Sequence, residues 1–181
     1  MEYYLEDSNN ARRNTVTVIG GNSISYTAVL SVKFTDPPII TEPVTPAEVK
    51  TWCAIDGTDY DSIITILISA ARQMVEDYAN LSLIDRKIKA KVRAGTNLPY
   101  GGTILILNVE DNDGNSIDAE YQELQDNGEY TVTYNVTAIV TAKLKAAVLQ
   151  QVVFMYENRG DATAEGLSPM VKSSLKSLRF V

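Results

Sequence analysis

The spacing of apolar residues changes abruptly before the middle of the chain. Between residues 59 and 80 apolar side chains recur at helical spacing, at Ile63, Ile64, Leu67, Ile68, Ala71, Met74, Val75 and Tyr78. From residue 86 to 94 the period falls to two, with lysine and arginine alternating with apolar residues. Because a helical pattern does not suit a strand, this change predicts an amphipathic helix followed directly by a β-strand.

Three further stretches have the composition of β-strands, and they lie at residues 103–110, 115–122 and 128–136. The pair Asp113-Gly114 between the first two is a hairpin signal. Nearer the N-terminus, residues 14–34 are rich in β-branched side chains around a Gly20-Gly21-Asn22 turn. This segment predicts a hairpin, or an arm that adds to another sheet.

Helices are predicted on both sides of these strands. Thr45 and Glu48 form a capping box that starts a short helix ending near Ala54. A long helix is expected from about residue 142, capped by Thr141, to Arg159. Gly160 then has the place of a helix-ending glycine, so we interpret the Arg159-Gly160-Asp161 tripeptide as a helix end rather than an adhesion motif. A last helix is expected from Ser168-Pro169 to about Leu178.

The predicted fold class is therefore α+β, a helical bundle with an inserted small antiparallel β-sheet and an N-terminal β arm. Residues 1–44 are expected to form the arm and a linker. Residues 45–181 are expected to form one domain, with helices in 45–84 and 138–181 and the β insertion at 86–137.

The composition excludes several kinds of chemistry. The chain has no histidine and a single cysteine, Cys53, so Ser-His and Cys-His triads and Cys/His zinc sites are excluded. No convergent set of acidic ligands stands out, so we expect no metal, no cofactor and no enzymatic activity. A metal-dependent hydrolase that uses Asp or Glu remains the remotest alternative.

Charge is distributed unevenly along the chain. The net charge is −7, yet residues 140–181 carry six basic and three acidic side chains. An acidic body argues against tight wrapping of nucleic acid. The N-terminal residues lack the pattern of a secretory leader, and no apolar run is long enough to span a bilayer, so synthesis in a reducing cytoplasm and no membrane contact are expected.

The basic residues of 86–93 allow two interpretations. They could face DNA, or they could pair with the acidic stretch 110–129, which holds eight acidic residues and no basic one. We favour the second interpretation, because opposite charges on neighbouring strands stabilise a sheet and the charged face of a small sheet is commonly the solvated one.

Two blocks of the sequence resemble a known family. Residues 45–84, TPAEVKTWCAIDGTDYDSIITILISAARQMVEDYANLSLI, contain a short helix, an acidic turn and a long helix with an Ala-Ala pair. Residues 144–161, LKAAVLQQVVFMYENRGD, form the second block. Both are similar to the tailed-bacteriophage head-tail connector family, also called head-completion or adaptor proteins.

The resemblance implies a structural virion protein at the head-tail interface. Members form a homo-oligomeric ring, usually twelve-fold, beneath the portal protein. The ring extends the DNA channel without binding DNA specifically, and it presents a platform to the next connector or tail protein. In relatives the C-terminal segment docks against the portal. The corresponding candidates here are Lys172, Lys176, Arg179 and Phe180.

Two further sets of contact residues are expected. The candidates for facing the DNA channel are the acidic residues Asp111, Asp113, Asp118 and Glu120. The candidates for contacts between neighbouring subunits lie on the polar face of the 59–80 helix and at the end of the later helix, and they are Arg72, Glu76, Glu157 and Arg159. A solvated helix face is the alternative interpretation for this second set.

The main alternative function is a small ligand-binding or regulatory α+β module. Its pocket would lie on the sheet and would be lined by Tyr121, Tyr130 and Tyr134. Tyrosines at such positions serve more often as core or cross-strand packing.

Overall fold

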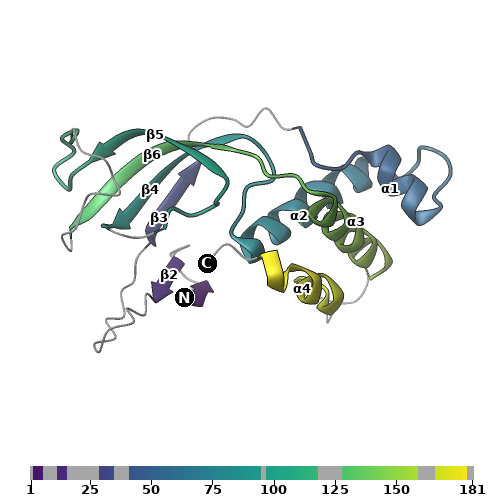
Figure 1. Ribbon diagram of the computed structural model, residues 1–181. Helices are drawn as coiled ribbons and strands as arrows, with labels where there is room; N and C mark the ends of the chain where they lie inside the picture. Colours follow the sequence, from purple (N-terminus) through teal and green to yellow (C-terminus); the bar gives the residue numbers. More distant parts are fainter. Residues whose placement is uncertain are drawn as a thin grey trace. The chain divides into compact units, whose positions relative to one another are not determined.

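The computed structural model describes residues 2–5, 12–15, 29–34, 41–94, 97–117, 128–158 and 166–178. The chain divides into two compact units, and Figure 1 shows the elements of both. The helical unit comprises residues 40–84 and 138–180, and the sheet unit comprises residues 1–39 and 85–137 with residue 181. Four helices and a four-stranded antiparallel sheet confirm the predicted α+β fold.

The helical unit is built from helices that lie far apart in the sequence. They are α1 (Pro46–Cys53), α2 (Asp61–Ala79), α3 (Ala142–Glu157) and α4 (Pro169–Leu175), with the 3₁₀ turn η2 (Lys176–Leu178) after α4. The capping box predicted at Thr45 and Glu48 is present, and Thr141 caps α3 as expected. Asn80 ends α2 in the left-handed conformation, with φ of 55°, which turns the chain away from the helix axis.

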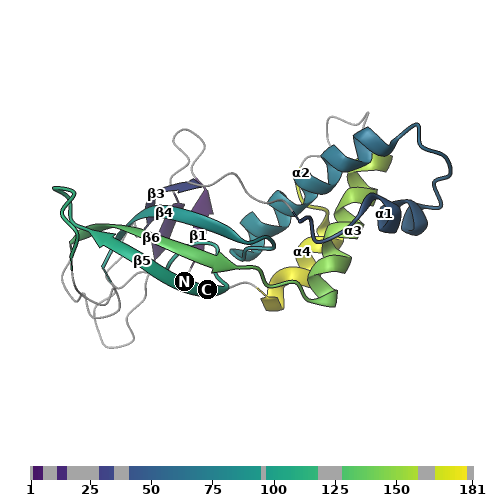
Figure 2. The ribbon, with the colours of Figure 1, turned by 90° about the horizontal axis from the view of Figure 1, so that it is seen from above.

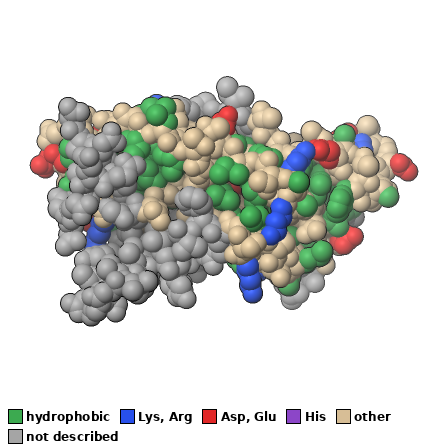
Figure 3. Space-filling view, viewed as in Figure 1, with side chains coloured by type: hydrophobic (Ala, Val, Ile, Leu, Met, Phe, Trp, Pro, Cys, Tyr) green, Lys and Arg blue, Asp and Glu red, His purple; other side chains and the backbone are tan. Residues whose placement is uncertain are grey.

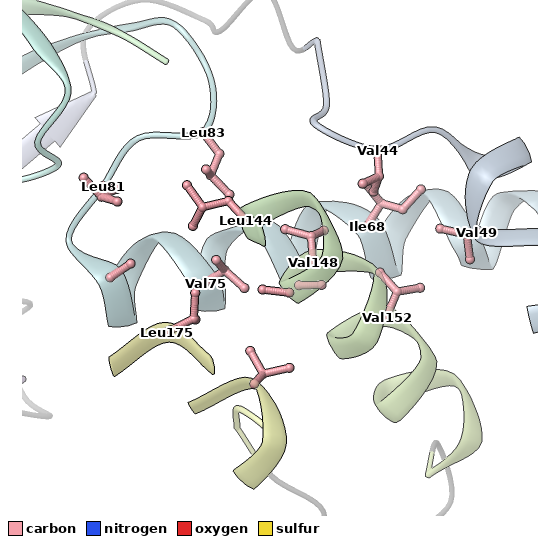
Figure 4. Packing of buried hydrophobic residues seen from close by; sticks show 14 of the residues in the cluster. Val44, Val49, Ile68, Val75, Leu81, Leu83, Leu144, Val148, Val152 and Leu175 are labelled. Carbon is pink, nitrogen blue, oxygen red and sulfur yellow. The ribbon is translucent and has the colours of Figure 1, made fainter. Parts of the chain in front are cut away.

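One hydrophobic core holds these helices together. Side chains of α2, α3 and α4 meet in it, and segments beside the helices contribute Val44, Leu81 and Leu83. Figure 4 shows α2 contributing Ile68 and Val75, α3 contributing Leu144, Val148 and Val152, and Leu175 closing the cluster from α4. Burial of this many branched side chains is the main stabilising contribution in the unit.

The sheet unit contains a four-stranded antiparallel sheet in the order β3-β4-β6-β5, which Figure 2 shows from above. Its strands are β3 (Val29–Phe34), β4 (Arg86–Arg93), β5 (Thr103–Glu110) and β6 (Glu129–Thr137). The central pair is in register along its whole length, from Arg86 opposite Val136 to Arg93 opposite Glu129. A separate two-stranded sheet joins β1 (Glu2–Leu5) and β2 (Arg12–Thr15).

Alternation along the strands separates two faces of this sheet. Ile88, Ala90 and Val92 of β4 are fully buried, as are Val132 and Tyr134 of β6. The lysines and arginines of β4 alternate with these residues and stay partly exposed. The period-two pattern therefore correctly predicts both the strand and the side of it that is buried.

Several predicted boundaries hold and others shift. The prediction for 103–110 matches β5, and that for 128–136 matches β6 within one residue. In the segment 14–34, β3 pairs with β4, so this part of the arm does add to the sheet. The turn predicted at Gly20-Gly21-Asn22 lies outside the described residues, as does most of the strand predicted at 115–122.

The end of α3 also differs slightly from its prediction. The helix ends at Glu157, two residues before Arg159. The tripeptide Arg159-Gly160-Asp161 lies outside the described residues.

Candidate functional site

A set of polar contacts fixes α1 in the helical unit. The Glu48 carboxylate accepts hydrogen bonds from the Thr45 backbone N–H, at 2.8 Å, and from Lys145 Nζ on α3, at 2.7 Å. The hydrogen bond from Lys145 and those from Thr45 lower the pKa of Glu48 from 4.5 to about 2. Lys50 Nζ binds Asp61 at 2.8 Å and so ties α1 to the start of α2.

A buried ionic network is formed by Arg72 and Glu76 of α2. Arg72 Nη1 donates to Glu76 Oε2 at 2.6 Å, and Arg72 Nε donates to Glu42 at 2.8 Å. Glu76 Oε1 accepts the backbone N–H of Leu83 at 2.7 Å. Arg72 is 4% exposed and Glu76 is 1% exposed. The network therefore joins α2 to the segment before α1 and to the segment that leads away from α2.

The alternative interpretation of Arg72 and Glu76, a solvated helix face, is wrong, and their contact with a neighbouring subunit stays a prediction. Their helix positions are polar in sequence, but the segments that contain Val44 and Leu83 cover them. A subunit contact through these two residues would require the buried network to open. Of the other two candidates for subunit contacts, Glu157 is exposed on α3, and Arg159 lies outside the described residues.

Exposed lysines gather where α3 begins. Lys143 lies in the first turn of α3, and its Nζ donates to Ser177 Oγ at 2.7 Å. This contact brings η2, with Lys176, beside the start of α3. Lys172 is one turn earlier on α4 and is also exposed. We call Lys143, Lys172 and Lys176 the basic end of the helical unit. The other two docking candidates, Arg179 and Phe180, lie outside the described residues.

Exposed acids gather where α3 ends. The Tyr156 ring of α3 packs edge-on against Tyr60, with centroids 5.9 Å apart, so the loop between α1 and α2 lies beside the last turn of α3. Asp56 and Asp59 are exposed in this loop, and Glu157 is exposed at the helix end. We call Asp56, Asp59 and Glu157 the acidic end of the helical unit.

Cys53 lies beside the acidic end and is only partly buried. Burial, and then the charge of Glu157, raise the pKa of the Cys53 thiol above its usual value. A raised pKa keeps the sulfur protonated and a poor nucleophile.

The acidic hairpin of the sheet unit is only partly described. Asp111 Oδ1 accepts the backbone N–H groups of Asp113 and Asn115, at 2.9 and 2.8 Å. The hydrogen bonds from Asn115 contribute most to lowering the pKa of Asp111. Asp111 therefore stabilises the turn, whereas Asp113 is exposed at its tip. Asp118 and Glu120 lie outside the described residues.

The lysines of β4 pair with acids, as favoured from the sequence. Lys89 Nζ lies 2.9 Å from Glu110, and Lys91 Nζ lies 3.1 Å from Glu129. Arg93 lies 3.8 Å from the same Glu129 carboxylate. These side chains are partly exposed, so the pairs contribute little to stability individually.

The described residues offer little that would do chemistry. Tyr134 is fully buried and donates its hydroxyl to the Pro99 carbonyl at 2.8 Å, and Tyr130 is 8% exposed. Both belong to the core of the sheet, and Tyr121 lies outside the described residues. No group of three His, Cys, Asp or Glu side chains in the described part of the chain is placed to hold a metal. Within the same part, no helix combines the length and apolar character needed to cross a bilayer.

Comparison with known proteins identifies the family of the chain. A family model described as "Phage gp6-like head-tail connector protein" matches residues 45–176. The chain belongs to this head-tail connector family. The resemblance seen in residues 45–84 and 144–161 is therefore confirmed, and the match extends across the β insertion. The connector is a structural protein of a phage-type particle.

One solved structure supports the same fold. It is described as "Neck of empty GTA particle computed with C6 symmetry", and its matching chain is 17% identical, with a TM-score of 0.61. The match covers 84% of the connector and 96% of that chain. At this identity the likeness shows the fold alone. No curated protein matches the connector sequence.

Sequence reasoning missed the gathering of charges at opposite ends of the helical unit. Lys143 and Glu157 both carried a signal, because each has the unfavourable sign for its end of a helix. The grouping of Asp56 with Glu157, or of Lys176 with Lys143, depends on tertiary contacts and has no signature in the sequence.

Proposed function

We propose that the connector forms a closed ring of identical subunits beneath the portal, extends the DNA channel and carries the next neck or tail protein. The observation that carries this proposal is the family match over residues 45–176, which includes both helical blocks and the inserted sheet. The neck neighbour adds support, because its chain matches over nearly its whole length.

We further propose twelve subunits, so that the ring follows the symmetry of a twelve-fold portal. The neck neighbour was computed with C6 symmetry, and a ring of twelve identical subunits also satisfies sixfold symmetry. Contacts between subunits in such a ring are heterologous, meaning that two different surfaces of the same chain meet.

The test is quantitative mass spectrometry of purified particles together with single-particle imaging of the neck. The proposal expects as many copies of the connector as of the portal protein, and particles made without the connector should package DNA but lack an attached tail. Absence of the connector from mature particles would refute the proposal.

A channel role for the acidic hairpin is part of this proposal. Repulsion between acidic side chains and phosphate lets DNA slide through a channel without being held. Replacing Asp113, Asp118 and Glu120 by lysine should slow DNA ejection. The matched control replaces the same residues by Asn, Asn and Gln, and it should eject DNA nearly as fast as the wild type. Equal ejection rates for the lysine variant and the wild type would show that the hairpin does not face the channel.

Docking of the basic C-terminal segment on an acidic surface is also part of the proposal, with the portal as the first candidate partner. Deletion of residues 168–181 is a poor test, because Val171 and Leu175 are fully buried and their loss would open the helical core. Replacing the exposed Lys172 and Lys176 by glutamate keeps the core intact. This double variant should fail to attach to particles that carry a portal, and normal attachment would contradict the docking.

A further inference from the structure

Helix α3 carries its charged residues against its own dipole. A helix has a partial positive charge at its N-terminus and a partial negative charge at its C-terminus, so acids favour the first turn and bases the last. The fully described α3 has no acid in its first turn and no base in its last. It has Lys143 at the start and Glu157 at the end instead, about 21 Å apart at 1.5 Å per residue. Both charges add to the helix dipole rather than offset it.

Other exposed charges reinforce each end instead of neutralising it. Lys172 and Lys176 join Lys143 at the basic end, and Asp56 and Asp59 join Glu157 at the acidic end. None of these six side chains forms an ion pair with another described residue. In contrast, Glu48, Lys50 and Arg72 of the same unit all do. Figure 3 shows blue side chains near α4 and red ones at the opposite end of the helical unit.

Each end also exposes large apolar side chains. Val140, which comes just before α3 at the basic end, is 46% exposed. Trp52 is 56% exposed and Tyr60 is 41% exposed, and they flank the acidic loop. Protein interfaces commonly combine apolar or aromatic anchors with a charged periphery, and both ends of the helical unit have this composition.

We infer that the acidic end of one helical unit binds the basic end of the next copy of the same chain. Three acidic side chains on one surface face three lysines on another. The partial negative charge at the C-terminus of α3 and the partial positive charge at the N-terminus of the next α3 add to this attraction. Two different surfaces of one chain then meet head to tail, which is the contact that generates a ring. The inference rests on the proposed ring and specifies its subunit contact. It replaces the portal by a neighbouring copy as the partner of Lys172 and Lys176, because the chain itself carries the complementary surface.

Three variants test this contact. The basic-end variant combines Lys143→Glu with Lys176→Glu, and the acidic-end variant combines Asp56→Lys with Glu157→Lys. The third variant carries all four substitutions and keeps the net charge of the wild type. Each variant is produced in cells infected by phage that lack the connector, and its copies per purified particle are counted by mass spectrometry.

Each of the two-residue variants should assemble more than about tenfold less well than the wild type, because like charges then face each other. The four-substitution variant should recover most of the assembly, since its ends are again complementary. An equal mixture of the two-residue variants should also recover assembly, because the two chains can alternate around a ring with an even number of subunits.

Thermal unfolding separates these defects from misfolding. Glutamate at position 143 and lysine at position 157 both suit the dipole of α3, so the variants should be at least as stable as the wild type. Lower assembly together with unchanged or higher Tm is the expected combination. A large fall in Tm would overturn the assignment of these side chains to an exposed contact.

The results for the three variants distinguish a neighbouring copy of the chain from another protein as the partner of the basic end. If only the basic-end variant fails and the four-substitution variant is not rescued, the basic end binds another protein such as the portal, and the inference is wrong. Normal assembly of both two-residue variants also contradicts the inferred subunit contact, but it does not contradict the proposed ring. If the wild-type connector itself is absent from particles, the proposed function fails first and the inference fails with it.

Discussion

The buried network around Arg72 permits a sharp stability prediction. Arg72→Met removes the cation that contacts both Glu42 and Glu76, and it leaves the Glu76 carboxylate 1% exposed. Removing one partner of a buried ion pair costs about 3–5 kcal/mol, because the remaining charge loses its compensation. For a chain of this size, each kcal/mol lowers Tm by about 2–4 °C, so a fall of about 6–20 °C is expected.

A companion substitution separates the charge from the hydrogen bond. Glu76→Gln keeps an oxygen that can accept the Leu83 N–H, so it should cost less, about 1–3 kcal/mol. The double variant should be more stable than the sum of the single effects implies, with a coupling energy of at least about 1 kcal/mol. Gln73→Met is the matched control, because Gln73 is the exposed neighbour on the same helix and should change stability by less than about 0.5 kcal/mol.

Urea unfolding followed by tryptophan fluorescence is a suitable assay. The chain has one tryptophan, Trp52 of α1, so the signal reports on the helical unit. A cost below about 1 kcal/mol for Arg72→Met would refute the reasoning, because it would mean that water solvates the two carboxylates in the folded state.

Three further predictions concern single sites. The pKa of Glu48 is lowered from 4.5 to about 2, so the stability that its carboxylate contributes is present above about pH 4.5 and is lost as the pH falls through about 2. Glu48→Gln should therefore be less stable than the wild type near pH 6. The difference in Tm between the two proteins should vanish near pH 2. Cys53 should react slowly with iodoacetamide at about pH 8, because the pKa of its thiol is raised. Glu157→Gln removes one of the two causes of this raised pKa and should speed the reaction modestly. An unchanged rate would contradict a contribution from the charge of Glu157. Gly102→Ala should cost about 1–3 kcal/mol in urea unfolding, because a Cβ at this position would lie 2.7 Å from the backbone oxygen of Thr137, and a neutral effect would show that the strand shifts freely.

The elements with strong local patterns could be predicted from the sequence. Strand β4 alternates between charged and apolar residues, and both the strand and its buried side were predicted. The α2 pattern correctly identified Ile64 and Ile68 as core residues. It wrongly placed Ile63 with them, since this side chain is 43% exposed. A spacing rule defines a helix face only to within about one residue, and neighbouring elements decide which flank is covered.

The buried network around Arg72 could not be predicted from the local sequence pattern. Arg72 and Glu76 lie four residues apart on a helix, which in sequence is the spacing of an ordinary surface ion pair. They are buried because the segments holding Val44 and Leu83 cross over them, and those segments have no periodicity of their own. Burial of a charged pair by irregular chain is a tertiary property, so composition and spacing could not indicate it.

The separation of α2 from α3 along the sequence has a consequence for the timing of synthesis. The apolar side of α2 is made first, but its main partner α3 emerges only after the whole sheet segment, residues 85–137, has been translated. At about 5–20 residues per second, this interval lasts on the order of several seconds. A nascent chain interrupted in that interval has no closed helical core, and it lacks Lys143, Glu157 and α4. Prematurely terminated polypeptides would thus complete neither of the two surfaces that we propose to meet between neighbouring subunits.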